Sequence, residues 1–369
     1  MHLESKGRVA RQAHVGIPEG TYEEEHGRQG FFGKSSELYH LHMPTGWTRV
    51  EGPLRPRMFL GARAEPSDLS DPRGEPMMIA ENADAAVLIS RRRAPMPYLF
   101  RNADGDELHF VHRGNGVLDT DYGPLNFEPG DYIYLPKGTS YQVRPETTDN
   151  LFLIIRSVAE LTWPDRGLLG KQAFIDPMMV ESPEPVAHAD EPGEWELRVL
   201  RGGERTSFFY PYHPLDVVGW QGDLSPIRFN VRDLRPIVSA RYHLAPTVHG
   251  TLFSDTCSIC TFAPRPLESD EACEKVPYFH RNVDWDELIF YHSGEFFSRG
   301  GIEPAAMTLH PQGVHHGPQP NARNAARTKT HTNEVAILIE TKNPLKVAPD
   351  AASIEITDYA TSWARQGAR

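Results

Sequence analysis

Residues 97–114 read PYLFRNADGDELHFVHRG, and residues 277–294 read PYFHRNVDWDELIFYHSG. Eleven of the eighteen positions are identical without a gap, at a constant offset of 180 residues. Self-similarity of this length at one offset indicates an internal duplication. Each copy is followed by a second, shorter match, which begins at Pro136 after the first copy and at Pro311 after the second. The chain is therefore predicted to contain two homologous halves.

The segments within each copy have the pattern of β-strands. Residues 132–135 are β-forming and lie between a Pro-Gly turn and a Pro-Lys-Gly turn. Thirty-two prolines and 30 glycines suit short strands joined by frequent turns. The expected fold is mainly β, with two antiparallel jelly-roll or β-barrel domains that arose by duplication.

A length of 369 residues exceeds that of one ordinary core, so two domains are expected. We expect four ranges along the chain. They are an N-terminal arm with strands over 1–75, a first half over 76–160, connecting strands and loops over 161–240, and a second half over 241–369.

The composition excludes several classes of protein. A net charge of −12 argues against a nucleic-acid surface, and the one compact basic run, Arg91 to Arg93, is interpreted as a solvated turn. No apolar run approaches the roughly 18 residues that a membrane span requires. The N-terminus does not resemble a secretion signal. The three cysteines do not suggest a disulfide framework, and Cys257 and Cys260 are interpreted as strand residues. A cytoplasmic protein is expected.

The polar residues of the second copy have a spacing that resembles the cupin pattern. Its first motif is met by His280, Asn282, Glu287 and Gly294, and its second motif, Pro-x-Gly-x-x-His, ends at His316. Residues two apart on a strand point to one face, so His280 and Asn282 are expected to face inward together. Glu287 enters the return strand, and His316 closes the site from a later strand. These positions predict a metal site with ligands His280, Glu287 and His316.

The first copy serves as an internal control. Phe100 stands where the second copy has His280, and Tyr141 stands where it has His316, while Glu107 is retained. Phenylalanine cannot bind a metal, so the first half is expected to keep the fold without the site. The other histidines of the two copies, and one beside the second motif, are interpreted as structural: His109, His112, His292 and His315.

Two histidines and one carboxylate that leave positions open are typical of the facial triad of non-haem Fe(II) oxygenases. Fe(II) is therefore the expected cofactor. Zinc suits the same ligands, and manganese and nickel also stay open.

The second half resembles the homogentisate 1,2-dioxygenase family. The resemblance runs through residues 215–243, the PYFHRN box at 277–282, Leu309 with His310, and the His-Gly-Pro box at 316–318. It implies a two-domain cupin whose C-terminal half binds iron and opens a hydroquinone ring with dioxygen. It also implies a homo-oligomer, a trimer or a hexamer.

The same resemblance assigns roles to residues around the metal. It makes His243 the histidine that takes a proton from the ring hydroxyl, a role that suits the pKa of imidazole. It places His310 where it can orient substrate or oxygen, and Tyr278 at an aromatic position near the site. Asn282 is expected to face the substrate rather than to bind the metal. Phe296 stands where the family has a substrate-contacting tyrosine, so one hydroxyl donor is absent.

Three functions stay open from the sequence. The first is a ring-cleaving dioxygenase acting on a small hydroquinone-like or aminophenolic aromatic acid, with homogentisate as the leading candidate. The second is a cupin metalloenzyme of another type, an isomerase or a hydrolase that uses zinc, manganese or nickel. The third is a non-catalytic binding protein of the same fold. No nucleic-acid or membrane partner is expected.

Overall fold

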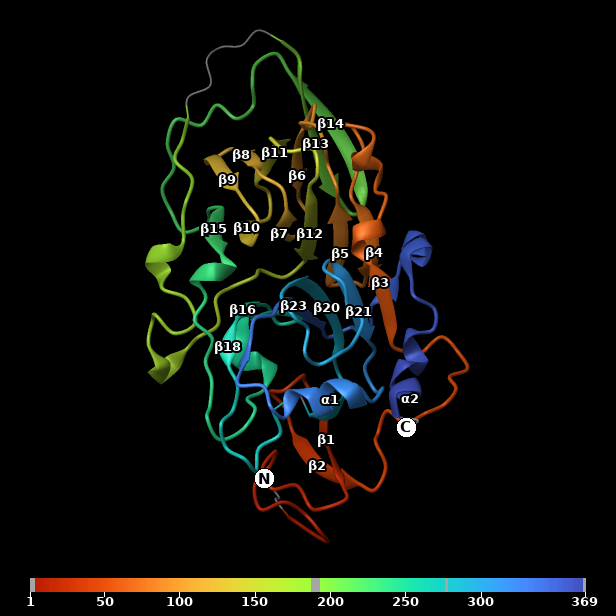
Figure 1. Ribbon diagram of the computed structural model, residues 1–369. Coiled ribbons are helices and arrows are strands. Elements are labelled where there is room, and N and C mark those ends of the chain that lie inside the picture. Colours follow the sequence, from red (N-terminus) through yellow and green to blue (C-terminus); the bar gives the residue numbers. More distant parts are fainter. Residues whose placement is uncertain (1–3, 187–192, 276–277, 368–369) are drawn as a thin grey trace.

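A computed structural model describes residues 4–186, 193–275 and 278–367 of the chain (Figure 1). The described chain is dominated by strands, and the prediction of a mainly β protein built from two antiparallel halves is confirmed. Each half consists of a pair of facing sheets.

The first half contains one seven-stranded and one six-stranded sheet. The seven-stranded sheet has the order β15 (Ile227–Asn230), β10 (Asp131–Leu135), β7 (Asp106–Arg113), β12 (Leu151–Ser157), β5 (Ala85–Ser90), β4 (Met77–Glu81) and β24 (Lys346–Val347). The six-stranded sheet has the order β14 (Glu204–Tyr210), β13 (Trp195–Arg201), β6 (Leu99–Asn102), β11 (Ser140–Pro145), β8 (Gly116–Thr120) and β9 (Gly123–Phe127).

The second half contains a six-stranded and a three-stranded sheet, with a two-stranded ribbon beside them. The six-stranded sheet has the order β16 (Gly250–Phe253), β17 (Cys257–Phe262), β23 (Val335–Thr341), β20 (Asp286–Ser293), β21 (Ala306–His310) and β3 (Arg57–Leu60). The three-stranded sheet has the order β19 (Phe279–Asn282), β1 (Tyr22–Gly27) and β2 (Ser35–His40). The ribbon pairs β18 (Arg265–Pro266) with β22 (His331–Thr332).

Helices are short. The α-helices are α1 (Pro320–Ala326) and α2 (Ser362–Gly367). Single turns and short stretches of 3₁₀ helix lie at Gly61–Arg63, Ser67–Leu69, Gly167–Leu169, Pro177–Met179, Val231–Asp233, Pro246–His249, Pro349–Ile354 and Tyr359–Thr361. None of the helices described has the length and apolar character needed to cross a membrane.

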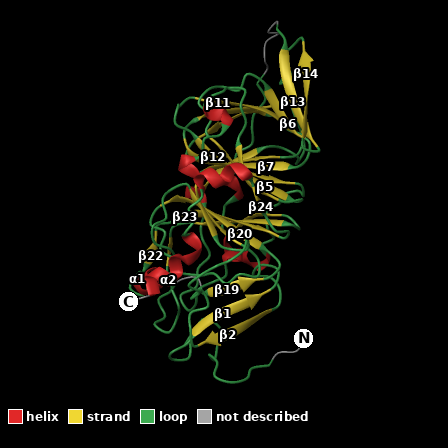
Figure 2. Ribbon diagram, turned by 90° about the vertical axis from the view of Figure 1, so that its right-hand side faces the viewer, coloured by secondary structure: helices red, strands yellow, loops and turns green. Residues whose placement is uncertain are grey.

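The sheets stack in layers along the long axis of the molecule (Figure 2). The alternation of side chains on the duplicated strands explains this stacking. On β7 and β20, Leu108, Phe110, Leu288 and Phe290 face a shared core that joins the two halves. The intervening residues of these strands face the interior of their own half, where Glu107 and Glu287 lie. The strand period therefore places one glutamate inside each half.

Distant segments of the chain complete both halves. The N-terminal hairpin β1–β2 adds to β19 of the second half, with β1 parallel to β19, and β3 forms an edge of the six-stranded sheet of that half. Conversely, β24, which lies near the C-terminus, pairs with β4 of the first half. The two halves are therefore held together by exchanged strands as well as by their common core.

Candidate metal centre

His280, Glu287 and His316 converge in the interior of the second half. His280 lies on β19 and Glu287 begins the following strand β20, after a short turn. His316 lies in the loop after β21, where a backbone bridge holds it beside His280. The amide of each histidine donates to the carbonyl of the other, with both N···O distances 2.9 Å. The backbone therefore fixes the two imidazoles side by side.

The three side chains form one compact cluster. Oε2 of Glu287 lies 3.6 Å from Nε2 of His280 and 3.6 Å from Nε2 of His316. One ligand atom from each residue fits within a span of 4.8 Å. The exposed fractions are 7%, 6% and 2% for His280, Glu287 and His316. The cluster is thus closed to bulk water.

The hydrogen bonds of the two imidazoles define which nitrogen is free. Nδ1 of His280 lies 3.1 Å from the carbonyl oxygen of Tyr278, and Nδ1 of His316 lies 3.1 Å from that of Val314. A carbonyl only accepts, so each Nδ1 carries the proton and each neutral Nε2 presents a lone pair. Both Nε2 atoms are buried without a hydrogen-bond partner among the described residues. Two orphaned lone pairs beside a carboxylate oxygen are the donor set that a divalent metal ion requires.

His310 holds the carboxylate of Glu287. It lies directly opposite Glu287 in the β20–β21 ladder, and its Nδ1 donates to Oε1 at 2.7 Å. The hydroxyl of Tyr359 lies 3.2 Å from its Nε2. Burial and the nearby Arg299 guanidinium lower the pKa of His310 to about 3, so the ring is neutral. Oε1 is therefore engaged with His310, and Oε2 is left to face the two ligand histidines.

The pKa values of the three residues reflect the electrostatic attraction between the Glu287 carboxylate and the histidines around it. Burial raises the pKa of Glu287, but the surrounding His316, His280 and His310 outweigh burial and hold it well below its usual range. Burial alone would lower the pKa of His280, but the Glu287 carboxylate outweighs burial, and the net shift is upward. For His316, burial and the nearby His280 lower the pKa. Glu287 is therefore an anion at neutral pH, as a ligand must be.

The N-terminal segment covers this site, which sequence reasoning did not reveal. Glu25 of β1 is in register with His280 of β19, and the Phe31 ring lies 5.1 Å from the imidazole of His280. A Cβ added at Gly30 would meet Oε1 of Glu340 at 3.2 Å, so the turn after β1 approaches a second buried carboxylate of this half. Pairing between β1 and β19 spans more than 250 residues, and no local sequence signal marks it.

A second group of possible ligands, His14, Glu23 and Glu37, lies in the same N-terminal region. Two of its members are already engaged with each other: both oxygens of Glu23 accept from the backbone amide of His14, and Nδ1 of His14 lies 2.9 Å from Oε2 of Glu23. Oε2 of Glu37 is buried without a hydrogen-bond partner among the described residues. The ring of His14 stacks on Tyr278 with a centroid distance of 3.8 Å. This group therefore links the N-terminal arm to β19.

The residues expected around the metal are distributed over several environments. His243 is buried, and its Nδ1 lies 2.9 Å from Oε1 of Glu268; none of the hydrogen bonds among the described residues joins it to the triad. Oδ1 of Asn282 accepts from the amides of Asp284 and Trp285 and so shapes the turn before Glu287.

The two aromatic positions differ in burial. Tyr278 is buried, and burial together with Glu25 raises the pKa of its hydroxyl well above the usual value. The half-buried Phe296 packs edge-on against Tyr291 at a centroid distance of 4.9 Å.

The first half has a different arrangement around its own glutamate. Glu107 accepts from Tyr141 at 2.6 Å, from Nε of Arg156 at 2.7 Å and from Nε2 of His109 at 2.9 Å. Phe100 packs edge-on against Tyr141. The glutamate is thus enclosed by donors, and it is not part of either potential metal cluster found among the described residues.

The two β halves, joined by exchanged strands, define a two-domain cupin protein, and the buried cluster of two histidines and one glutamate is its candidate metal centre. Residues 79–231 match the family described as homogentisate 1,2-dioxygenase N-terminal, and residues 244–367 match homogentisate 1,2-dioxygenase C-terminal. The chain belongs to the homogentisate 1,2-dioxygenase family, which confirms the resemblance seen in the sequence and places the chain among dioxygenases.

Two relatives agree with this placement. A Saccharolobus solfataricus protein, provisionally named a dioxygenase, is 33% identical over 357 residues, which cover 92% of each chain. Homogentisate 1,2-dioxygenase of Bradyrhizobium diazoefficiens is 27% identical over 281 residues, which cover 72% of this chain and 62% of the relative. Among solved structures, a cupin 2 conserved barrel domain protein from Leptotrichia buccalis has a TM-score of 0.36 at 8% identity, with 73% of this chain and 88% of that chain covered.

Proposed function

We propose that this protein is a non-haem Fe(II)-dependent dioxygenase that cleaves the ring of a hydroquinone-like or aminophenolic aromatic acid, with homogentisate as the leading candidate. The observation that carries the proposal is the pair of buried, partnerless Nε2 atoms of His280 and His316 beside Oε2 of Glu287. Membership of a dioxygenase family supports the reaction type. The names of the relatives favour an aromatic substrate and dioxygen.

The donor set suits Fe(II). Two imidazoles and one carboxylate oxygen occupy three positions and leave the others for substrate and dioxygen. When bound, Fe(II) supplies the redox chemistry by which dioxygen reacts with an electron-rich ring. His310 contributes by holding Oε1 of Glu287, which keeps Oε2 directed at the metal position.

His243 is proposed to take the proton of a ring hydroxyl. If Nδ1 donates to the Glu268 carboxylate, Nε2 is left as the accepting atom. Such a pair fixes the tautomer and stabilises the imidazolium that forms when the proton arrives. This role requires the loop around 243 to face the substrate when it is bound.

Four further residues are proposed to contact the substrate: Tyr278, Asn282, Phe296 and His310. The raised pKa of Tyr278 keeps its hydroxyl protonated beside Glu25. Phe296 offers a ring face without a hydroxyl, so a polar group of the substrate near it would lack a partner. The covering segment around Phe31 would exclude water from the reacting centre. A cytoplasmic homo-oligomer, a trimer or hexamer, is part of the same proposal.

Oxygen consumption tests the proposal. Purified chain loaded anaerobically with Fe(II) is expected to consume oxygen with homogentisate, or with a related hydroquinone or aminophenol acid such as gentisate. His243→Ala should slow turnover while iron binding is retained, whereas His331→Ala, at an exposed site, is the matched control. Oxygen uptake that is absent across the panel from protein with a full complement of iron would overturn the proposal.

A further inference from the structure

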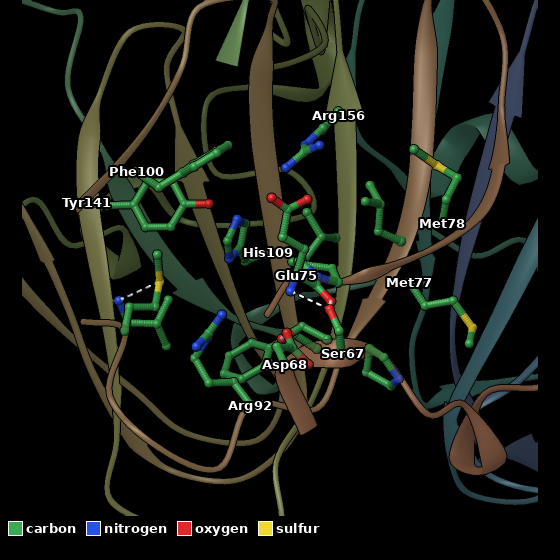
Figure 3. Close-up of a pocket in the computed structure, with 18 of the residues that line it drawn as sticks. Ser67, Asp68, Glu75, Met77, Met78, Arg92, Phe100, His109, Tyr141 and Arg156 are labelled. Carbon is green, nitrogen blue, oxygen red and sulfur yellow. Dashed lines mark hydrogen bonds between the residues drawn. The ribbon is translucent and has the colours of Figure 1, made fainter. Parts of the chain in front are cut away.

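The first half contains a cavity of about 490 Å³ between its two facing sheets (Figure 3). Phe100, Tyr141, His109 and Arg156 surround one end of it, and Met77 and Met78 lie on the opposite side. We propose that this cavity is a second, metal-free ligand site, which binds a small monocyclic carboxylic acid that carries a ring hydroxyl. The inference does not depend on the ring-cleaving reaction.

The carboxylate of Glu107 holds the side chains that form the polar end of the cavity. This carboxylate is 1% exposed, and it accepts one hydrogen bond each from Arg156, His109 and Tyr141, which line the cavity, and a fourth from Nδ2 of Asn102. Burial raises its pKa, but Arg156, His109 and Tyr141 together hold it well below the usual range, so it stays ionised. The glutamate that would bind a metal in the second half is here a fixed support for three side chains.

Two of these side chains keep polar atoms for a ligand. Arg156 uses Nε for Glu107, and its terminal nitrogens make no hydrogen bond with residues in the described ranges. His109 uses Nε2 for Glu107, so in its neutral tautomer Nδ1 is an unshared acceptor. A guanidinium edge binds a carboxylate through two parallel N–H donors, and an imidazole acceptor suits a hydroxyl. The cavity thus offers the N–H donors of a guanidinium and a ring nitrogen of an imidazole close together.

The walls favour a flat, apolar body between these two groups. They carry Met78, Met96, Phe100, Val143 and Phe152. Thioether sulfurs and aromatic edges make favourable contacts with a ring. A volume of about 490 Å³ is within the range of small-molecule sites, ~300–1,000 Å³. A single aromatic ring with short substituents fits this space.

The other charged side chains of the lining and the rim are mostly engaged with each other or with the backbone. Arg92 donates to the carbonyls of Pro72 and Gly74, Asp68 accepts from Ser90 and the amide of Arg91, and Arg205 pairs with Glu75. Glu65 and Asp350 complete the rim. Glu75 adds to the negative field at Arg156, so an entering carboxylate competes with it for that guanidinium. Arg156 lines the cavity with its terminal nitrogens unused by residues in the described ranges.

Calorimetry with 4-hydroxyphenylacetate tests the site. The full-length His316→Ala chain, prepared without metal, removes the other centre from the measurement. One binding site per chain is expected. Phenylacetate, which lacks the hydroxyl, and 4-hydroxybenzyl alcohol, which lacks the carboxylate, should each bind about tenfold more weakly or worse. The absence of saturable binding by 4-hydroxyphenylacetate would overturn the inference.

Two further substitutions locate the binding. Arg156→Lys keeps the positive charge and loses the two-pronged contact, so binding should weaken about tenfold. Met78→Phe replaces a flexible wall side chain by a rigid, slightly larger ring and should weaken binding about tenfold, whereas Met179→Phe, at an exposed position, should not change it. If Arg156→Lys does not fold, Met78→Phe decides the question alone. Undiminished binding by a folded Met78→Phe chain would place the ligand elsewhere and contradict the proposal. Oxygen uptake by the iron-loaded Met78→Phe chain should stay normal, which separates this site from the proposed function.

Discussion

Nδ1 of His310 donates to Oε1 of Glu287 across a 2.7 Å contact, while Oε2 of the same carboxylate lies 3.6 Å from each ligand imidazole. The two oxygens of Glu287 therefore differ: Oε1 is held by the hydrogen bond from His310, and Oε2 is free to bind a metal ion. Since Tyr359 in turn contacts His310, the position of the free oxygen depends on a chain of buried side chains.

His310→Ala is expected to lower metal affinity by about 10–100-fold, because partners that orient metal ligands typically contribute that much. Competition with a chelator of known affinity measures the effect. Tyr359→Phe, which removes only the hydroxyl that contacts Nε2, should have the smaller effect. Equal metal affinity in His310→Ala and the unsubstituted chain would show that metal binding does not depend on the hydrogen bond from His310 to Oε1 of Glu287.

Gly317→Ala should disturb the metal centre. Its added Cβ would meet Phe279 at 2.7 Å from Cδ1 and 2.9 Å from Cα, directly beside both ligand histidines. A displacement of about 1 Å at a reacting centre can reduce turnover about 100-fold. Gly313→Ala is the matched control, because Gly313 also has a positive φ but has nothing within 4 Å of the added atom. Its cost should be limited to backbone strain of about 1–2 kcal/mol in the free energy of unfolding. The same metal affinity and turnover in both variants would contradict the prediction.

Glu107→Ala should destabilise the first half and leave metal binding intact. It removes the acceptor of four donors and leaves the Arg156 guanidinium without its partner. Breaking a buried ion pair in this way costs about 3–5 kcal/mol. Denaturant unfolding measures the loss, and elemental analysis should still find one metal ion per chain. A halved metal content would mean that the first half also holds a metal.

Acid should destabilise the junction between the halves. His112 and His292 occupy equivalent positions of the repeat and contact each other through Nδ1 at 2.9 Å. Burial and the neighbouring histidine lower the pKa of His112 to about 3, and burial lowers the pKa of His292 to about 4. Both histidines are therefore neutral when folded, whereas the unfolded chain takes up their protons near pH 6.5. Their contribution to stability is present above pH 6.5 and is lost as the pH falls toward 4.

The expected slope is up to about 1.4 kcal/mol per pH unit for each histidine. Unfolding free energies measured between pH 7 and pH 4.5 test this expectation. The double substitution His112→Gln with His292→Gln should flatten the curve over this interval. An unchanged pH dependence in the double variant would assign the acid sensitivity to other groups.

The duplication made much of the fold predictable. Residues 97–114 and 277–294 share eleven of eighteen positions, and their pattern indicated both the strand type and the inward direction of Glu287. The spacing from His280 to Glu287 predicted that these residues lie close together, because a strand, a tight turn and a return strand place them on one face.

Other features could not be read from local sequence. The pairing of β1 with β19 and of β24 with β4 joins segments more than 250 residues apart, and periodicity carries no information about such partners. His310 was expected from family resemblance to contact substrate or oxygen, but its hydrogen bond to Glu287 depends on the β20–β21 register. The network of Glu107 was equally hidden, because Arg156 comes from a strand outside the repeated motif.

Metal content measured on the full-length chain is the most direct test of the central claim, that His280, Glu287 and His316 form one iron site. Protein incubated anaerobically with Fe(II) and freed of excess metal is expected to retain one iron per chain. His280→Ala and His316→Ala should each lose it, whereas His331→Ala should keep it. Full iron retention by either ligand variant would contradict the account.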